Sequence, residues 1–365
     1  MTTAAATGPV KLTEYGIPVR NVWYMLLYTW GQHLSREKWR AEVEAAPTLD
    51  ALLARILAAE LEQRLRIGLG REYVTTSARL RSIRGKIDFP RSLRKQLFDR
   101  GEAHCHYQTF AVDAPRNQII KSTLVRLIGT GDFNGGSPGA AISLRQRLRR
   151  LVRDLDGVSV LELTPQLVRR QQFGRNDRDY ELMLNICLFL LERSLLTEQA
   201  GTVSSLKADR DALQLSTVFE QFVAAFFRHH LHDWNVSPQK RLAWPTPGFV
   251  PHLPGMIADL VLTSPAGEML VLDTKFTARS LLPTWGGALR FDSGHLYQLY
   301  AYLRTQENHS VAHARAGGIL LYPTVKEKLS EAFTVQGHEM RIETVDLAGE
   351  WEGIEAELLT IVGAG

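Results

Sequence analysis

The chain has few of the features that stabilise secreted or membrane-bound proteins. Its 365 residues include two cysteines, Cys105 and Cys187, too few for a disulfide framework and typical of a reducing compartment. No apolar run approaches the roughly 20 residues that a membrane-spanning helix needs. Residues 1–10 lack the apolar core of a signal peptide. We therefore expect a cytoplasmic protein that has no membrane partner.

A nucleotide-binding P-loop is also missing. Gly85 and Lys86 are followed by isoleucine, and the glycine-rich loop 132–140 (DFNGGSPGA) contains no lysine. The pattern G-x-x-x-x-G-K-[ST] holds nucleotide phosphates with backbone amides and its lysine. Because the pattern is absent, any nucleotide-driven step is expected to belong to a partner. His104-Cys105-His106 lacks a second pair of metal ligands at suitable spacing, and alternation sends the cysteine opposite to both histidines, so an ordinary strand is expected there.

Net charge is low, at +4, but it is unevenly distributed. Residues 1–205 hold 30 Lys and Arg against 21 Asp and Glu, whereas residues 206–365 hold 13 against 18. A basic stretch spans 64–100, and a predicted helix over 143–155 carries five arginines: Arg145, Arg147, Arg149, Arg150 and Arg153. Such patches attract phosphate backbones or acidic protein surfaces, although most charge runs are solvated faces. The acidic second half is not expected to hold DNA tightly by itself.

The length of the chain predicts two domains, because it exceeds one comfortable core. We place an N-terminal α+β region at residues 1–205 and a second domain at 206–365, with the junction in 201–211. Helical spacing predicts a first helix over 17–30, with Asn21 as its candidate N-cap. Further helices are predicted after Asp50, over 117–128 and over 143–155, and a β-rich stretch over 73–110 turns near Gly85 and Gly101.

The most informative segment is Met256–Phe276 (MIADLVLTSPAGEMLVLDTKF), which is typical of a β-hairpin. Two apolar runs flank the turn-forming sequence Ser264-Pro265-Ala266-Gly267. Side chains alternate between the faces of a strand, so Asp273 and Lys275 point the same way. Asp259 and Asp273 are equidistant from Ala266, and a turn centred there sets the two aspartates side by side.

Two carboxylates and an amine on one face are suited to a Mg²⁺ site beside a water-handling lysine. The plainer alternative is a structural ion pair, because D-x-K occurs by chance in most proteins of this length. Apolar residues around Asp259 and Asp273 favour the functional interpretation, since a charge emerging from a buried strand is costly unless it has a partner or a task. The arrangement resembles the metal site of PD-(D/E)XK nucleases. We therefore expect Asp259, Asp273 and the Thr274 backbone carbonyl as metal ligands, and Lys275 beside the attacking water.

The surrounding elements follow the same order as the core of that superfamily. An amphipathic helix precedes the hairpin, with an apolar stripe at Phe219, Phe222, Val223, Phe226 and Phe227. A helical pattern over 294–304 and a buried-strand run over 318–323 follow it. Gln298 and Tyr302 match the Gln-x-x-x-Tyr element that such nucleases often carry, but Gln298 equally fits a partly exposed helix position. Glu220 either projects toward the metal or belongs to a solvated helix face.

From about residue 17 to residue 361, the chain resembles the McrC family, the nuclease subunit of McrBC modified-cytosine restriction systems. The resemblance rests on Ile17-Pro-Val-Arg-Asn-Val-Trp-Tyr-Met-Leu, Arg84-Gly-Lys-Ile-Asp-Phe89, Asn117-Gln-Ile-Ile-Lys-Ser-Thr-Leu124, Leu270-Val-Leu-Asp-Thr-Lys-Phe276, Leu296-Tyr-Gln-Leu299 and Gly317-Gly-Ile-Leu-Leu-Tyr-Pro323. The nuclease motif alone indicates only a large superfamily. The opening segment together with Arg-Gly-Lys-Ile is much more specific.

The resemblance implies an α/β fold, with a C-terminal PD-(D/E)XK nuclease core (a mixed central sheet flanked by helices) and an N-terminal α+β domain that docks on a partner. That partner, McrB, is a GTP-hydrolysing AAA+ ring that carries the modified-DNA reader, and the family's amino-terminal region inserts into the ring and stimulates hydrolysis. The expected function is Mg²⁺-dependent cleavage of double-stranded DNA that contains modified cytosine. GTP is bound by the partner and not by this chain.

Two departures from the family pattern limit the transfer. Ala258 stands where the superfamily name puts proline, and Glu220 falls in no motif specific enough to carry a role over. Two rival functions remain open from the sequence. One is a stand-alone nuclease, and the other is a non-catalytic activator of an AAA+ ring.

Overall fold

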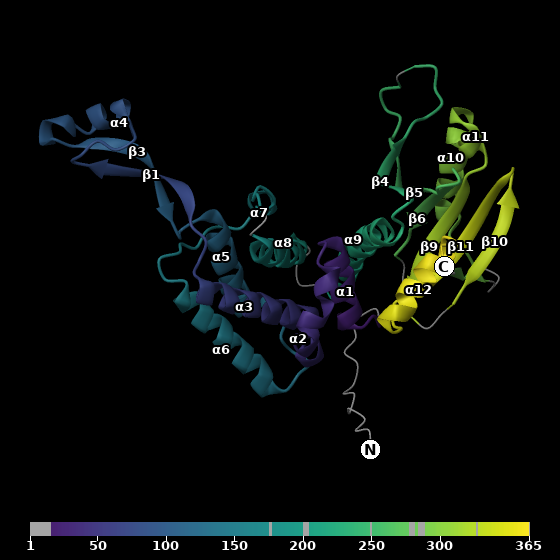
Figure 1. The fold of residues 1–365 in the computed structure, drawn as a ribbon, viewed down its shortest axis with the longest axis horizontal. Coiled ribbons are helices and arrows are strands. Elements are labelled where there is room, and N and C mark those ends of the chain that lie inside the picture. Colours follow the sequence, from purple (N-terminus) through teal and green to yellow (C-terminus); the bar gives the residue numbers. More distant parts are fainter. Residues whose placement is uncertain are drawn as a thin grey trace. The chain divides into compact units, whose positions relative to one another are not determined.

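The computed structural model describes residues 16–174, 177–199, 204–248, 250–276, 282–283, 289–325 and 328–364. The chain forms two compact units (Figure 1). Unit 1 comprises Met1–Glu44 and Leu196–Gly365, and unit 2 comprises Ala45–Leu195. This division differs from the boundary expected near residue 205, because residues 16–44 pack with the second half of the chain.

Unit 1 is built on a mixed six-stranded sheet in the order β10-β11-β9-β6-β5-β4 (Figure 1). The strands are β4 (Asn235–Leu242), β5 (Met256–Thr263), β6 (Met269–Thr274), β9 (Gly317–Thr324), β10 (Ser330–Val335) and β11 (His338–Asp346). β9 pairs in parallel with β6 and β11, and the other neighbours are antiparallel. β9 is buried almost throughout, as its uninterrupted apolar run predicts for an interior parallel strand. The predicted α/β class with a mixed central sheet is confirmed.

The described helices of unit 1 are α1 (Val19–Thr29), α2 (Arg40–Ala45), α9 (Ser204–His230), α10 (Ser293–Gln306), α11 (Val311–Ala314) and α12 (Trp351–Ile361), and of these α9, α10 and α12 pack on the sheet. Short 3₁₀ segments span His33–Trp39 and Glu307–His309, and β7 (Leu282–Pro283) and β8 (Leu289–Arg290) form a separate pair of strands. A Cβ atom at Gly318 would lie 2.9 Å from a Leu303 methyl, so glycine lets α10 pack closely on β9. Phe222 joins α9 to α1 and α12, because its ring lies 5.6 Å from Tyr28 and 5.4 Å from Trp351 between centroids.

The first helix lies within the range predicted for it, but Asn21 does not cap it. α1 starts at Val19, directly after Pro18. Asn21 is fully buried, and its Nδ2 donates hydrogen bonds to the backbone oxygens of Leu347 (2.8 Å) and Gly349 (2.9 Å). The prediction of an N-cap was wrong because the side chain satisfies carbonyl groups 326 residues away instead of its own helix end.

Replacing Asn21 by leucine is expected to lower the free energy of unfolding by about 2–3 kcal/mol, because two backbone carbonyls lose their donor. Urea denaturation of the purified chain measures the effect, and Asn308→Leu, at an exposed position of unit 1, serves as the control. Equal midpoints for Asn21→Leu and the natural chain would show that these two bonds contribute nothing.

Unit 2 combines a helical part with a three-stranded sheet. Its helices are α3 (Leu49–Ile67), α4 (Phe89–Arg94), α5 (Pro115–Thr130), α6 (Pro138–Asp154), α7 (Pro165–Arg169) and most of α8 (Arg178–Gln199). The sheet runs β1-β3-β2, with β1 (Glu72–Leu80), β2 (Lys86–Ile87) and β3 (Ala103–Ala111), and both pairings are antiparallel. Within this unit the sheet and α4 project from the helices (Figure 1). The predicted turns are confirmed, since Gly85 and Gly101 both have positive φ, of 68° and 67°.

Several arginines of the run on α6 make contacts within unit 2. Arg147 and Arg150 both pair with Glu62 of α3, with closest distances of 2.8 and 2.9 Å. Hydrogen bonds from Arg147 hold the pKa of the Glu62 carboxyl below its usual value. The Arg145 guanidinium donates to the Gly131 carbonyl and lies over the Phe133 ring. The run is therefore in part an internal packing device, and the positive charge that it offers to a phosphate backbone is smaller than its composition indicates.

The segment expected to join the two domains is helical where the structure describes it. The junction expected over 201–211 falls partly outside the described residues, but Ser204 already begins α9, so 204–211 is helical. Cys105 and Cys187 are free, and both are buried. Within the described ranges, no helix is both long and apolar enough to cross a membrane.

Candidate active site

The hairpin of β5 and β6 has the register that the sequence predicts. Leu260 pairs with Leu272 and Thr263 with Met269, so continuing the pairing by one residue sets Asp259 opposite Asp273. The turn closes through a 2.9 Å hydrogen bond from the Gly267 amide to the Ser264 carbonyl, and Gly267 takes a φ of 84° that suits glycine. Local turn chemistry and the alternation of apolar residues thus fix where the two carboxylates lie.

Asp273 is completely buried, yet neither of its carboxylate oxygens accepts a hydrogen bond of acceptable geometry. The Lys275 ammonium lies 2.6 Å from Oδ2 and supplies an ion pair. Burial raises the pKa of Asp273 to about 6, and the negative charge of Asp259 acts in the same direction, against Lys275. The ion pair engages Oδ2 and leaves Oδ1 of this buried carboxylate without a partner among the described residues, which costs stability, so the arrangement is not explained by folding alone.

Asp259 is held in place by the neighbouring strand. Its Oδ2 accepts hydrogen bonds from the backbone amide (2.8 Å) and the hydroxyl (2.7 Å) of Thr274. Thr274 ends β6 and pairs with Leu321 of β9, and the Lys275 amide donates to the Leu321 carbonyl at 3.0 Å, which fixes the backbone at the lysine. The structure therefore brings Asp259, Asp273, Thr274 and Lys275 together at one edge of the hairpin, as the spacing predicts.

Lys275 is oriented by a chain of hydrogen bonds from α10. Its Nζ donates to Gln298 Oε1 at 2.9 Å, Gln298 Nε2 donates to the Tyr302 hydroxyl at 2.6 Å, and that hydroxyl donates to the Ile257 carbonyl at 2.7 Å. Of the two interpretations of Gln298, the geometry supports contact with the site rather than a solvated position. The chain of bonds restrains the lysine without neutralising it.

The carboxyl of Glu220, on α9, interacts electrostatically with the charged residues of the site. Burial raises the pKa of this half-buried carboxyl to about 7, and Asp259 is the next largest cause. Its Oε1 accepts a hydrogen bond from Gln239 Nε2. Glu220 thus lies close enough to both aspartates for their negative charges to raise its pKa.

Gln239 was not identified from the sequence. It belongs to β4 at the position that the register places opposite Asp259, and it has a φ of 49°, a conformation that residues with a side chain rarely adopt. Such strain is often found beside functional sites. No sequence signal indicated Gln239, because its place depends on how β4 aligns with β5 across the intervening segment 243–255.

The donor set fits a hard divalent cation. Carboxylate and backbone oxygens are the ligands that Mg²⁺ prefers, and the unpartnered Oδ1 of buried Asp273 is the observation that a cation would explain. Asp259 is close enough to raise the pKa of Asp273, so the two carboxylates repel each other without an ion between them.

Comparison with known proteins now identifies the family. Residues 11–323 match the model of the McrBC 5-methylcytosine restriction system component family. The chain belongs to this family. It is 30% identical over 351 residues to the type IV methyl-directed restriction enzyme EcoKMcrBC of Escherichia coli strain K12, covering 94% of this chain and 97% of the relative. The resemblance to McrC that the sequence motifs indicate is confirmed.

A solved structure shows the same fold. It is a half-complex from a tetradecameric assembly of Thermococcus gammatolerans McrB AAA+ hexamers with bound McrC, with a TM-score of 0.54, 16% identity, and coverage of 94% of this chain and 76% of that one. The cryo-EM structure of the McrBC complex from the same organism matches 59% of each chain at a TM-score of 0.39 and 18% identity.

Proposed function

We propose that this chain is the metal-dependent DNA endonuclease subunit of a GTP-driven restriction system that acts on modified cytosine. The observation that carries the proposal is the fully buried carboxylate of Asp273, which lies close to Asp259, pairs through Oδ2 with Lys275 and has no partner at Oδ1 among the described residues. The names of the relatives support the class of reaction, since they describe restriction enzymes and McrBC complexes.

Asp259 and Asp273 would hold Mg²⁺, with the Thr274 carbonyl as a further ligand. When bound, the ion would polarise the scissile phosphate and acidify a coordinated water. Lys275 would orient the attacking water and, as the free amine, accept its proton; the resulting ammonium would offset the charge that develops on the phosphate. Gln298 would hold the Lys275 ammonium, and Glu220, with its raised pKa, would be a second group able to exchange a proton near neutral pH.

A cleavage assay tests the proposal directly. The purified chain is incubated with methylated DNA, Mg²⁺ and GTP, with and without the AAA+ protein encoded beside it. Cleavage is expected only with all components. Cutting by the chain alone with Mg²⁺ and no nucleotide would instead identify a stand-alone nuclease, and equal cleavage by the natural chain and Asp273→Ala would leave only a non-catalytic activator.

Replacement of Gln298 by leucine is expected to slow DNA cleavage about 10–100-fold, which is the usual effect of losing a residue that orients a catalytic or ligating group. Lys275 would keep its charge but lose a 2.9 Å partner. Single-turnover cleavage measures the rate, and Gln63→Leu, at an exposed position of α3, is the control. If Gln298→Leu cleaves DNA at the rate of the natural chain, Gln298 is a partly exposed helix residue with no part in cleavage.

The projecting sheet of unit 2 is proposed to dock on the AAA+ ring rather than track DNA. Besides basic side chains, it exposes large apolar ones, which suit a protein interface better than a phosphate backbone. The most exposed are Tyr73, Ile83, Phe89, Leu93 and Phe110, between 54% and 71%. The test is GTPase stimulation by the full chain, with Ile83→Asp and Leu93→Asp expected to lose stimulation while Asp273→Ala keeps it.

A further inference from the structure

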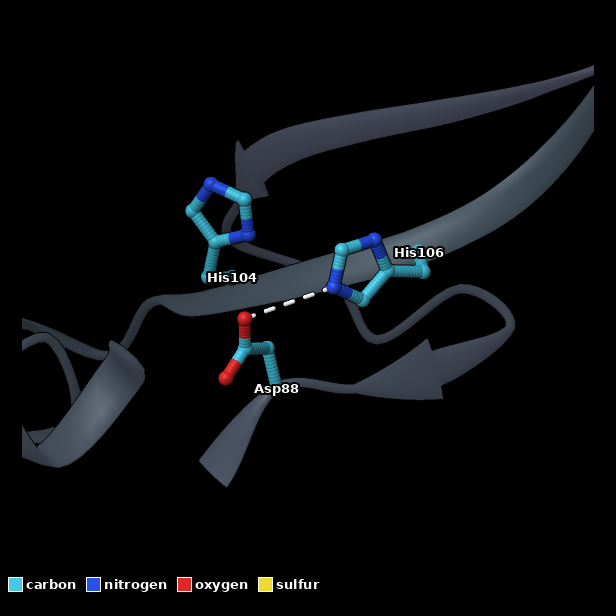
Figure 2. Close-up of side chains that lie close together, drawn as sticks. All are labelled: Asp88, His104 and His106. Atoms are coloured by element: carbon cyan, nitrogen blue, oxygen red, sulfur yellow. Dashed lines mark hydrogen bonds and ion pairs between the residues drawn. The ribbon is translucent and has the colours of Figure 1, made fainter. Parts of the chain in front are cut away.

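A second group of potential metal ligands lies in unit 2, away from the hairpin residues in the sequence. Asp88, His104 and His106 each offer a ligand atom, and these atoms lie within 4.8 Å of one another. Figure 2 shows the Asp88 carboxylate beside the rings of both histidines, with Asp88 Oδ2 and His106 Nε2 3.3 Å apart. Across the described ranges no other set of three His, Cys, Asp or Glu residues meets this spacing.

The three residues are fixed by the backbone rather than by chance approach. His104 and His106 are two residues apart on β3, so they share a face, while the buried Cys105 points to the other. Asp88 directly follows β2 and caps α4, because its Oδ1 accepts the Arg91 amide at 3.0 Å. That bond leaves Oδ2 turned toward His106. The Asp88 amide also donates to the His104 carbonyl at 2.8 Å, which locks the two segments together.

We propose that Asp88, His104 and His106 form a zinc site that joins β2 and α4 to β3. Two imidazoles and one carboxylate suit Zn²⁺ and exclude Mg²⁺ and Ca²⁺ as preferred ions, since those prefer oxygen alone. Bonds of about 2.0–2.1 Å in tetrahedral geometry set ligand atoms roughly 3.4 Å apart. One pair already has this spacing, and the widest needs to close by at most about 1.4 Å.

The surroundings complete the site. Zinc with three protein ligands keeps a fourth position for water or another oxygen. The Ser77 hydroxyl is 3.3 Å from His104 Nδ1, so a hydroxyl oxygen lies at the site. The buried His104 is further held by a 2.9 Å hydrogen bond from its backbone amide to Ser92 Oγ. Ligands that are themselves hydrogen-bonded are preorganised, which lowers the entropic cost of binding an ion.

The fold of this part of unit 2 gives zinc a structural task. Among residues 72–111, all of which the structure describes, the buried apolar side chains are those of Leu97, Ala103 and Cys105. β2 contributes only two register pairs, Lys86 with His106 and Ile87 with Cys105. A module with so small a core ordinarily needs a disulfide or a metal to hold its strands. The ion would hold β2 and α4 where hydrogen bonds and burial are sparse.

The experiment uses the untagged full chain, stripped with a chelator, loaded with one to two equivalents of zinc and passed through gel filtration. Bound zinc is measured by elemental analysis, and Co²⁺ substitution reports tetrahedral nitrogen ligation through its visible absorption. The natural chain is expected to retain about one zinc per molecule. His106→Gln and Asp88→Asn are expected to bind it at least about tenfold more weakly. Asp88→Asn keeps an oxygen to cap α4, so folding is preserved.

Two controls separate this site from others. His252→Gln removes an exposed histidine outside the cluster, and Asp273→Asn removes the hairpin carboxylate. Both should retain zinc and the cobalt spectrum. Three results would each overturn the proposal: no zinc on the natural chain, equal binding by His106→Gln and Asp88→Asn, or loss of zinc only in Asp273→Asn.

Discussion

Replacing Lys275 by methionine is expected to reduce the rate of cleavage of modified DNA by about 10²–10⁴-fold, the usual contribution of a positioned proton-transfer group. The ammonium is the only feature removed, because methionine keeps much of the side chain's length. Lys275 Nζ lies 2.6 Å from Asp273 and 2.9 Å from Gln298, so no large rearrangement is needed for it to act on a metal-bound water. Single-turnover cleavage in the presence of partner, GTP and Mg²⁺ measures the loss.

The matched control is Lys328→Met. Lys328 is 80% exposed and pairs only at the surface, with Glu357 at 3.5 Å, so its removal should leave the rate unchanged. GTP hydrolysis by the partner should be stimulated equally by both variants. If Lys275→Met cleaves DNA at the rate of the control, Asp273 and Lys275 form a structural ion pair and have no catalytic role.

The contribution of Asp273 and Glu220 to the stability of the metal-free chain is expected to fall as pH rises from about 4 to about 7. Burial raises the pKa of Asp273 to about 6, and that of Glu220 to about 7, so the folded chain binds protons that the unfolded chain has released. Protonation therefore stabilises the fold at low pH, and this contribution disappears as pH passes through the folded pKa values. For fully buried Asp273 the effect is on the order of 3 kcal/mol.

Asp273→Asn isolates this contribution, because asparagine is neutral at every pH. Urea unfolding in chelator is compared for the two chains at pH 4.5 and pH 8. The variant should gain stability relative to the natural chain as pH rises, and Mg²⁺ at pH 8 should stabilise the natural chain alone. A difference that does not change with pH would mean that Asp273 is ionised at both values.

The hairpin could be read from the sequence because its geometry is local. Four turn-forming residues fix the reversal, and alternation then determines which side chains share a face. Asp259, Asp273 and Lys275 needed no information from outside 21 residues. Gln298 was harder, because a helix position next to an apolar stripe gives no sign of whether it faces solvent or a strand; the bond from Lys275 decides it.

Long-range pairings were beyond such reasoning. Gln239 reaches the site through the alignment of β4 with β5, and Asp88 reaches the two histidines of β3 through a turn at Gly85, where a Cβ atom would lie 2.3 Å from the His106 carbonyl. Asn21 illustrates the same limit, since its type and position suit a helix cap but its partners are far along the chain. Propensity describes a residue's local options, and tertiary packing chooses among them.

The union of the two chain ends in unit 1 has a consequence for biosynthesis. Asn21 meets Leu347 across 326 residues. At about 5–20 residues per second, a ribosome needs roughly 16–65 s to make that interval. The newly made first helix, with Val22, Trp23 and Leu26 fully buried in the finished fold, lacks its packing partner α9 until residue 230 has been made, and its partner α12 until later still. Unit 2 can fold in the meantime, so we expect the apolar face of α1 to stay exposed on the nascent chain longer than the core of unit 2.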